Sequence, residues 1–374
     1  MMAVALQMLM RDRTKFISIV VGVAFSVMLI TEQGSIFSGL VRRSGAVILD
    51  THGVDLWVFD KAVKNIDDLR ALKDTDLYRV RAVEGVDWAV RWFKGQARAK
   101  RLDGRFENVL VIGVDDATLV GGPSYMVEGD VTALVRRDSA IIDSAGAKKM
   151  GGVKVGEELT FNDHRAVIVG SCEATRNFQS LPIVYTRYTQ AIQFVPTERN
   201  TLSAVLVKVK PGRNIADVAA AITKETGLAA VTPDGFRQMT LDYLFKFTGI
   251  VINFGTTVLL GFLVGAAVAG QTFYNFALEN LRHFGALKAM GASNGVLSRM
   301  IILQALVVAV LGYGVGVGLA AIPSLFTGPN GQLPFYPSMK LLAGSGAAVT
   351  VIAVFAGVIA LRKVRKVEPA IVFR

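Results

Sequence analysis

The stretch FISIVVGVAFSVMLI, from Phe16 to Ile30, decides the fold of this 374-residue chain. Every residue in it is apolar or small, and its apolar character continues to Val41. Comparable runs recur only at 245–277, 296–326 and 341–361. A helix rises about 1.5 Å per residue, so runs of this kind can cross a hydrocarbon core of about 30 Å. The pattern therefore predicts one membrane span, a long gap, and three further spans.

The expected fold class is a membrane α-helical protein with four transmembrane helices in a one-plus-three layout. A large α+β extracytoplasmic domain is inserted between helices 1 and 2. The chain is 52% hydrophobic with a mean hydropathy of +0.45, which indicates a membrane protein and not a soluble enzyme. The expected parts are 1–43, a cytoplasmic segment and the first span; 44–240, the outer domain; and 241–374, a C-terminal membrane domain. This last part is expected to hold spans at about 245–277, 296–326 and 340–361, a cytoplasmic helix at about 281–293, and a basic tail.

The net charge of +11 is concentrated beside the predicted spans. The outer segment 44–240 carries 26 Lys and Arg against 25 Asp and Glu, and the rest of the chain carries 15 against 5. Basic residues placed in this way orient membrane spans. Nucleic-acid binding, which a basic chain would otherwise suggest, loses its main support.

The basic groups predict the orientation. They precede the first span, surround the turn between the second and third, and follow the fourth: Arg11, Arg13, Lys15; Arg282, His283, Lys288, Arg299; Arg362, Lys363, Arg365, Lys366. The positive-inside rule places all three groups, and both termini, in the cytoplasm. We therefore expect a protein of the bacterial inner membrane with its middle domain in the periplasm. Arg42 and Arg43 oppose the rule, but they lead into a long translocated domain, where charge carries little weight.

The first apolar run has a second interpretation, a cleaved signal peptide. Its basic start fits, but no small-x-small cleavage site follows promptly, which favours a retained helix. Glu32 interrupts the run, and an acidic residue in a span is a candidate substrate contact. Because Glu32 lies about 25 Å beyond Lys15 along a helix, the alternative is a solvated carboxylate among the outer headgroups.

Short strand-like and helix-like segments alternate in the outer domain, which predicts an α+β fold. The expected strands are 54–59, 88–100, 108–114, a short one within 139–161, 164–171 and 202–209, and a turn at Asp103-Gly104 joins the second strand to the third as a hairpin. The expected helices lie within 66–83 and at 145–150 and 215–226. Trp88 and Trp92 are expected to pack in the core, with a ligand groove as the alternative. No residue set has the spacing of a catalytic site, so we expect a binding or transmission module.

The single cysteine, Cys172, excludes an intrachain disulfide and fits no metal-ligand spacing. The three histidines are scattered along the chain. We therefore expect no metal site and no cofactor bound by this chain.

Glycines are frequent in the predicted spans. In the sequence GYGVGVG, Gly312 and Gly316 lie four residues apart, and so do Gly314 and Gly318. Gly261 and Gly265 repeat this spacing in the second span. A phosphate-binding loop would need a strand and a helix in water, and a selectivity filter would need a re-entrant loop. Close helix packing needs only small residues at this spacing, and it is the interpretation that we favour.

The sequence ENLRHFGALKAMGASNGVLS, from Glu279 to Ser298, lies between the second and third spans. Phe284, Leu287 and Lys288 share one face of a short predicted helix, which Gly291 and Ser293 end. Such a helix in the cytoplasm is suited to dock a soluble partner. A passive connector at the membrane interface is the alternative.

This segment resembles the MacB/FtsX-like permease superfamily of ABC transporters (type VII permeases), whose loop reads approximately R-E-x-G-x-L-K-A-L-G-A-S. Arg282, Gly285, Leu287, Lys288, Ala289, Gly291, Ala292 and Ser293 match, Met290 replaces a Leu, and His283 stands where an acidic residue is common. The tail from Arg362 to Arg374 and the segments 138–152 and 155–170 are also similar to the family. Within it, 32–60 looks most like the DevC-like exporter permeases.

The resemblance implies a permease half-transporter that pairs as a homodimer and is powered by two copies of a separate ATPase subunit. The implied contact residues are Arg282, His283, Phe284, Gly285, Leu287, Lys288, Gly291 and Ser293. ATP and Mg would bind in the partner, since the chain has no Gly-Lys dipeptide and hence no Walker A loop. The absence of this loop therefore predicts that this polypeptide is not itself an enzyme.

The implied function is export or mechanotransmission, with substrate moved or released on the outer side of the membrane and a periplasmic adaptor as a further partner. The alternative is an FtsX-type transmitter that regulates a cell-wall hydrolase and transports nothing. A ligand sensor is disfavoured because the chain shows no cytoplasmic signalling domain. Haem, glycolipid, lipoprotein, peptide and drug all stay open as substrates.

Overall fold

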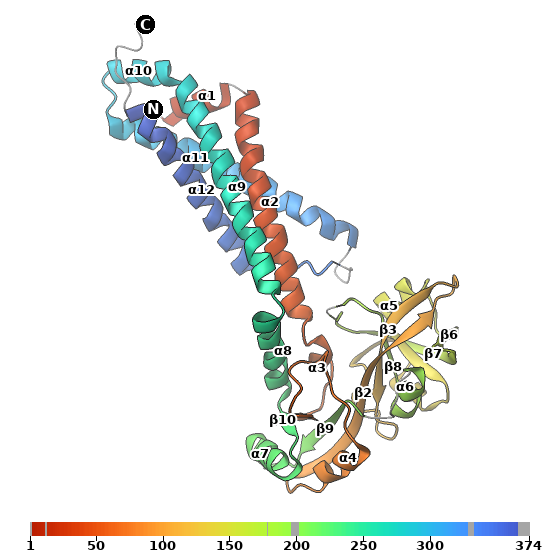
Figure 1. Cartoon of the computed structure of the whole chain (residues 1–374). Helices are drawn as coiled ribbons and strands as arrows, with labels where there is room; N and C mark the ends of the chain where they lie inside the picture. The colour runs from red at the N-terminus through yellow and green to blue at the C-terminus, as the bar shows by residue number, and fades with distance from the viewer. Residues whose placement is uncertain (1, 12, 178, 196–201, 328–332, 366–374) are drawn as a thin grey trace. The chain divides into compact units, whose positions relative to one another are not determined.

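The computed structural model describes residues 2–11, 13–177, 179–195, 202–327 and 333–365 and divides the chain into two compact units. Residues 1–40 and 249–374 form the membrane unit, and 41–248 form the outer unit. Four helices of the described chain are long and apolar enough to cross a membrane (Figure 1): α2 (Arg13–Arg43), α9 (Ile250–Glu279), α11 (Asn294–Thr327) and α12 (Met339–Arg365). The one-plus-three layout is therefore confirmed.

The spans of the membrane unit share one apolar core. It combines Val23 and Val27 of α2 with Phe273 of α9, Ile301 of α11 and Ile352 of α12. An ion pair between Lys15 and Glu279 joins the start of α2 to the end of α9. These two helices therefore run in opposite directions, as two spans separated by an outer domain must.

The second span begins later than the sequence suggested. The predicted run at 245–277 includes the end of α8 (Pro233–Phe247), and α9 begins only at Ile250. Between them, Gly249 has a φ of +66°, a left-handed conformation that ends one helix before the next begins. The Thr248 hydroxyl donates to the carbonyl of Leu244 at 2.5 Å. Hydropathy did not predict this break, because the residues on both sides of it are apolar.

A further helix, α1 (Met2–Arg11), precedes the first span and was not predicted. Its Ala5 and Leu9 are buried in the core of the membrane unit. The amide of Gln304, a fully buried side chain of α11, donates to the carbonyl of Ala5 at 2.7 Å. The N-terminal segment is thus held against α11 by both apolar and polar contacts.

The outer unit is built on a ten-stranded mixed sheet with the order β10-β1-β9-β2-β3-β8-β5-β7-β4, and β6 pairs with β2 and β7. The strands are β1 (Leu56–Phe59), β2 (Val86–Lys100), β3 (Phe106–Val114), β4 (Tyr125–Glu128), β5 (Ser139–Asp143), β6 (Glu158–Phe161), β7 (His164–Glu173), β8 (Ile183–Arg187), β9 (Ala204–Val209) and β10 (Ala229–Val231). β2 connects the two halves of the sheet, because its first half pairs with β9 and its second half with β3.

Helices flank this sheet: α3 (Ala46–Leu49), α4 (Asp74–Arg81), the 3-10 turn η1 (Val131–Val135), α5 (Ser144–Lys149), α6 (Tyr188–Phe194), α7 (Ile215–Thr226) and α8. The prediction of α7 is confirmed to the residue. Its first turn is capped by the Asn214 side chain, which accepts from the amide of Ala216, and it ends at Gly227 with a φ of +78°. The β2–β3 hairpin is also confirmed, whereas β4, β8, α6 and β10 were not predicted.

The tryptophans of the outer unit pack in its core. Trp57 and Trp92 are fully buried, with ring centroids 4.9 Å apart in an edge-to-face arrangement at 76°. Trp88 is half-buried against the same core. The packing interpretation is therefore confirmed for Trp92. Cys172 is fully buried as well, and this burial raises the pKa of its thiol.

Candidate coupling helix and outer-unit cleft

The predicted cytoplasmic helix is α10 (Leu281–Ala289), which lies between α9 and α11. Gly291 ends it with a φ of +94°, and the amide of Ala292 donates back to the carbonyl of Leu287 at 3.0 Å. Ser293 does not end this helix. Its hydroxyl instead accepts from the amide of Val296 at 3.4 Å, at the start of α11. The turn is therefore fixed at both ends.

The two faces of α10 have different roles. Phe284, Gly285 and Leu287 are buried, and Phe284 and Leu287 belong to the core of the membrane unit. These three residues anchor the helix and are not accessible to a partner in the single chain, because the apolar stripe packs inward. The accessible residues are Arg282, His283, Met290, Gly291 and Ser293, and Lys288 is half-buried.

The exposed face of α10 is small and basic. Arg282 supplies a guanidinium, which suits a carboxylate partner. Met290, at the end of the helix, exposes 75% of its surface, although it is a large apolar residue. A flexible apolar side chain beside fixed charges is typical of an interaction surface.

Four of the six glycines predicted to pack helices face α2. A Cβ on Gly312 would lie 2.6 Å from the Val23 side chain, and one on Gly316 would lie 2.5 Å from the carbonyl oxygen of Ala24. On α9, a Cβ on Gly261 would lie 3.2 Å from Leu29, and one on Gly265 would collide with Ser26. The approaches at Gly265, Gly312 and Gly316 are too close for a side chain unless a neighbour shifts, whereas the approach at Gly261 is only tight. Gly314 and Gly318, which the spacing also predicted to pack, face open space and meet no other helix of this chain.

Glu32 lies half-buried in α2, next to the fully buried Thr31. The hydroxyls of Thr31 and Ser35 have no hydrogen-bond partner among the described residues. Residues 31–35 of α2 therefore place two buried hydroxyls and a half-buried carboxylate within an otherwise apolar span. A substrate contact at Glu32 stays a prediction.

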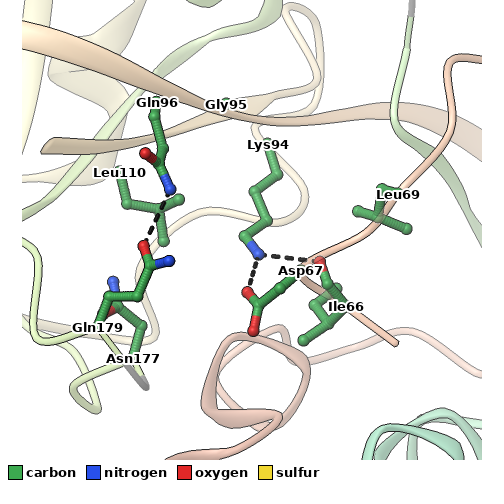
Figure 2. A pocket seen from close by; sticks show the side chains of 9 residues that line it. All are labelled: Ile66, Asp67, Leu69, Lys94, Gly95, Gln96, Leu110, Asn177 and Gln179. Carbon is green, nitrogen blue, oxygen red and sulfur yellow. Dashed lines mark hydrogen bonds and ion pairs between the residues drawn. The ribbon is translucent and has the colours of Figure 1, made fainter. Parts of the chain in front are cut away.

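A cleft of about 240 Å³ opens in the outer unit (Figure 2). Four separate segments of the chain line it, and three of them contribute polar side chains: Ile66, Asp67 and Leu69; Lys94, Gly95 and Gln96 of β2; Leu110 of β3; Asn177 and Gln179. Lys94, Gln96 and Leu110 lie on predicted strands, but no sequence pattern singled them out as parts of a site.

The charged groups of the cleft are paired. Lys94 Nζ donates to Asp67 Oδ1 at 2.5 Å and to the carbonyl of Ile66 at 2.9 Å. Gln96 Nε2 donates to Gln179 Oε1 at 2.9 Å on the other side of the cleft (Figure 2). The cleft is therefore lined by an ammonium, a carboxylate and three carboxamides within a small volume.

Two family models match the chain. The MacB-like periplasmic core domain matches residues 16–225, and the FtsX-like permease C-terminal domain matches residues 255–369. The first therefore covers α2 and most of the outer unit. The second covers most of α9 together with α10, α11 and α12.

Curated relatives agree with these matches. An uncharacterised ABC transporter permease of Mycobacterium tuberculosis (strain H37Rv) is 30% identical over 236 residues, which are 62% of this chain and 61% of the relative. A second one from the same strain is 29% identical over 157 residues, 39% of this chain and 42% of the relative. The chain thus spans about three fifths or less of the length of these relatives.

Two solved structures are similar to part of this chain. The extracellular domain of the noncanonic ABC-type transporter YknZ from Gram-positive bacteria has 13% identity and a TM-score of 0.36, covering 48% of this chain and 99% of that one. The periplasmic region of MacB from Actinobacillus actinomycetemcomitans has 13% identity and a TM-score of 0.39, covering 54% and 97%. Because the periplasmic core model alone matches more than half of the residues, the chain belongs to the MacB/FtsX-like family of ABC transporter permeases.

Proposed function

We propose that this chain is the permease subunit of an ABC-type export or mechanotransmission complex, powered by a separate ATPase subunit that docks on α10. The observation that carries the proposal is the division of α10 into a buried anchoring face and an exposed basic face. ATP and Mg would bind in the partner, and this chain would supply the docking surface and the path for movement.

The core around α10 supplies that path. Phe284 and Leu287 share it with Phe276 of α9, Met300 of α11 and Leu9 of α1. Because packed interiors are dense and transmit displacement, a push on α10 reaches several helices at once. The chain therefore needs no charged aqueous path through its spans, which supports release of substrate on the outer side.

The proposed location is the bacterial inner membrane, with both termini in the cytoplasm and the outer unit in the periplasm. α1 and α10, which carry basic residues, lie at the same end of the membrane unit (Figure 1). This common end is the one that the positive-inside rule places in the cytoplasm.

We further propose a homodimer with two ATPase copies and a periplasmic adaptor. α9 supports the pairing of two copies, since only 11% of its 18-residue apolar stretch is buried in the single chain, against 39% for that of α2. Asn253, Gln271 and Asn275 lie on its exposed face. Gln271 Nε2 donates to Asn275 Oδ1 at 3.4 Å, and a second protein surface against α9 would shield these carboxamides from lipid.

The test uses the full chain co-expressed with its ATPase. Met290→Asp and Arg282→Glu change the exposed face and should weaken the complex about tenfold or more, as hot-spot residues do. Co-purification of the ATPase and its stimulation by the permease are the measurements. Arg137→Glu is the matched control, because Arg137 is 92% exposed in the outer unit. If both α10 variants retain full stimulation, the docking site is wrong.

A further inference from the structure

The outer-unit cleft lies where β2 passes from one half of the sheet to the other. Lys94 and Gln96 follow directly after the residues of β2 that pair with β9. The backbone of Lys94 is fixed by Ser203, whose hydroxyl accepts from the Lys94 amide at 3.0 Å and donates to its carbonyl at 3.3 Å. The base of the cleft is therefore rigid.

Each wall of the cleft is tied to one of the two helices through which the chain leaves the outer unit. On one side, the amide of Ile66 donates to the buried hydroxyl of Thr240 in α8 at 3.2 Å. On the other, Arg43 at the end of α2 donates to the Ser180 hydroxyl at 2.9 Å, next to Gln179. Ser180 has a φ of +54°, an uncommon conformation for a residue with a side chain. The cleft thus lies between two anchored walls.

The ammonium of Lys94 is the strongest binding group of the cleft. Its side chain is only 9% exposed, whereas that of its partner Asp67 is 54% exposed. An ammonium has three donors, and a buried one is stable only with an anion beside it. A ligand carboxylate that entered the cleft could take the place of Asp67, which would return to water at little cost.

The other lining groups complement a peptide. The carboxamides of Gln96 and Gln179 carry the same donor and acceptor groups as a peptide bond, and their mutual hydrogen bond can be exchanged for bonds to one. Leu69 and Leu110 supply apolar surface for a side chain. The volume of about 240 Å³ is below the roughly 300–1,000 Å³ of sites for drug-sized ligands, so it suits the end of a chain.

We propose that this cleft binds the C-terminal end of a peptide. Lys94 binds the free carboxylate, Gln96 and Gln179 bind the last peptide bond, and Leu69 and Leu110 contact the last side chain. When no ligand is bound, the Lys94 ammonium pairs with the Asp67 carboxylate instead. This inference goes beyond the proposed function and does not depend on ATPase docking.

The experiment measures binding to the purified full chain by isothermal titration, without the ATPase. The probes are N-acetyl-Ala-Ala-Leu with a free carboxylate and the same peptide with a C-terminal amide. The acid should bind about tenfold more tightly, because only it forms a charge-assisted bond with Lys94. Lys94→Gln should abolish this preference, and Asp67→Asn should tighten binding of the acid several-fold.

Two variants separate the site from general effects. Lys100→Gln removes an exposed cation of the same strand outside the cleft and should leave both affinities unchanged. Gln179→Ala changes an exposed side chain and should weaken acid and amide equally. Thermal unfolding checks that each variant is folded. Absence of binding by both peptides at millimolar concentration, equal affinity for acid and amide, or an equal loss in Lys100→Gln would each overturn the proposal.

Discussion

The interactions that stabilise the membrane unit differ from those that stabilise the outer unit. In the membrane unit, α2 meets α9 and α11 at glycines, where a single added Cβ would collide with the neighbouring helix. The outer unit instead holds a buried carboxyl group in its core by hydrogen bonds. Asp143 is 4% exposed, and its carboxylate accepts from the amides of Gly146 at 2.8 Å and Ile183 at 2.6 Å.

The difference follows from the two solvents. Lipid is as apolar as the helix surfaces, so the hydrophobic effect does not drive spans together and close contact must do so. In water, apolar burial drives folding, and the polar groups buried with it need partners. Changes of volume should therefore dominate in the membrane unit, and changes of charge or hydrogen bonding in the outer unit.

The largest effect is expected where α10 is anchored. Phe284→Ala leaves a cavity at a fully buried position and should lower the free energy of unfolding of the membrane unit by about 3–5 kcal/mol. Denaturant titration in detergent micelles is the measurement. Met290→Ala, on the exposed end of the same turn, should change stability by less than about 0.5 kcal/mol. Similar losses in both variants would contradict the assignment of faces.

The next effect tests close packing in the spans. Gly316→Ala places a methyl group against the carbonyl of Ala24 and should cost about 1–3 kcal/mol, since α11 and α2 must separate. Gly314→Ala, two residues earlier on the same helix, meets open space and serves as the control. Its stability should be unchanged or slightly higher. The same detergent titration compares them, and a loss in Gly314→Ala would show that α11 is placed wrongly.

In the outer unit, Asp143 makes stability depend on pH. Burial raises the pKa of its carboxyl, although the hydrogen bonds from Ile183 and Gly146 oppose this shift. The folded state then holds the proton more tightly than the unfolded state, whose pKa is about 3.9. Stability should therefore fall as the pH rises from this value through the folded pKa, and Asp143→Asn should remove that dependence.

The measurement is the unfolding free energy of the outer unit across a pH series. Asp130 provides the contrast, because hydrogen bonds from Thr132 lower the pKa of its exposed carboxyl. Its contribution should have the opposite sign and increase with pH. A pH dependence that is the same in wild type and in Asp143→Asn would rule out a role for this buried carboxyl.

The smallest effect is expected at the ion pair of Lys15 and Glu279. Both side chains are nearly half exposed, at 46% and 48%. Exposed pairs contribute about 0–1 kcal/mol, so Glu279→Gln should cost less than about 0.5 kcal/mol. Stability at low and high salt is the measurement. A loss well above this value would show that charge matters in the membrane unit as much as shape does.

The spans could be predicted from the sequence because a continuous apolar run in lipid forms a helix, which satisfies all its backbone hydrogen bonds internally. Their ends could not. Phe245 and Phe247 extend the apolar run, and only the left-handed conformation of Gly249 shows that they belong to α8. Periodicity identified α10, but it could not show whether Phe284 faces a partner or the bundle, because both are apolar environments.

The cleft was beyond sequence reasoning for a different reason. Asp67, Lys94 and Gln179 meet only because the long strand β2 carries Lys94 and Gln96 between two loops that are far apart in the chain. Local patterns record alternation along one strand and contain no information on which loop lies opposite it. The pairing of Lys94 with Asp67 therefore becomes visible only in the fold.

The burial of Cys172 has a practical consequence. It is the only cysteine of the chain, it has no exposed surface, and its thiol is held in the unreactive protonated form by its raised pKa. The folded native protein should therefore not react with maleimides or with thiol-specific spin labels. A reporter cysteine introduced beside α10 or at the cleft would then give a signal free of background, without first replacing a native residue.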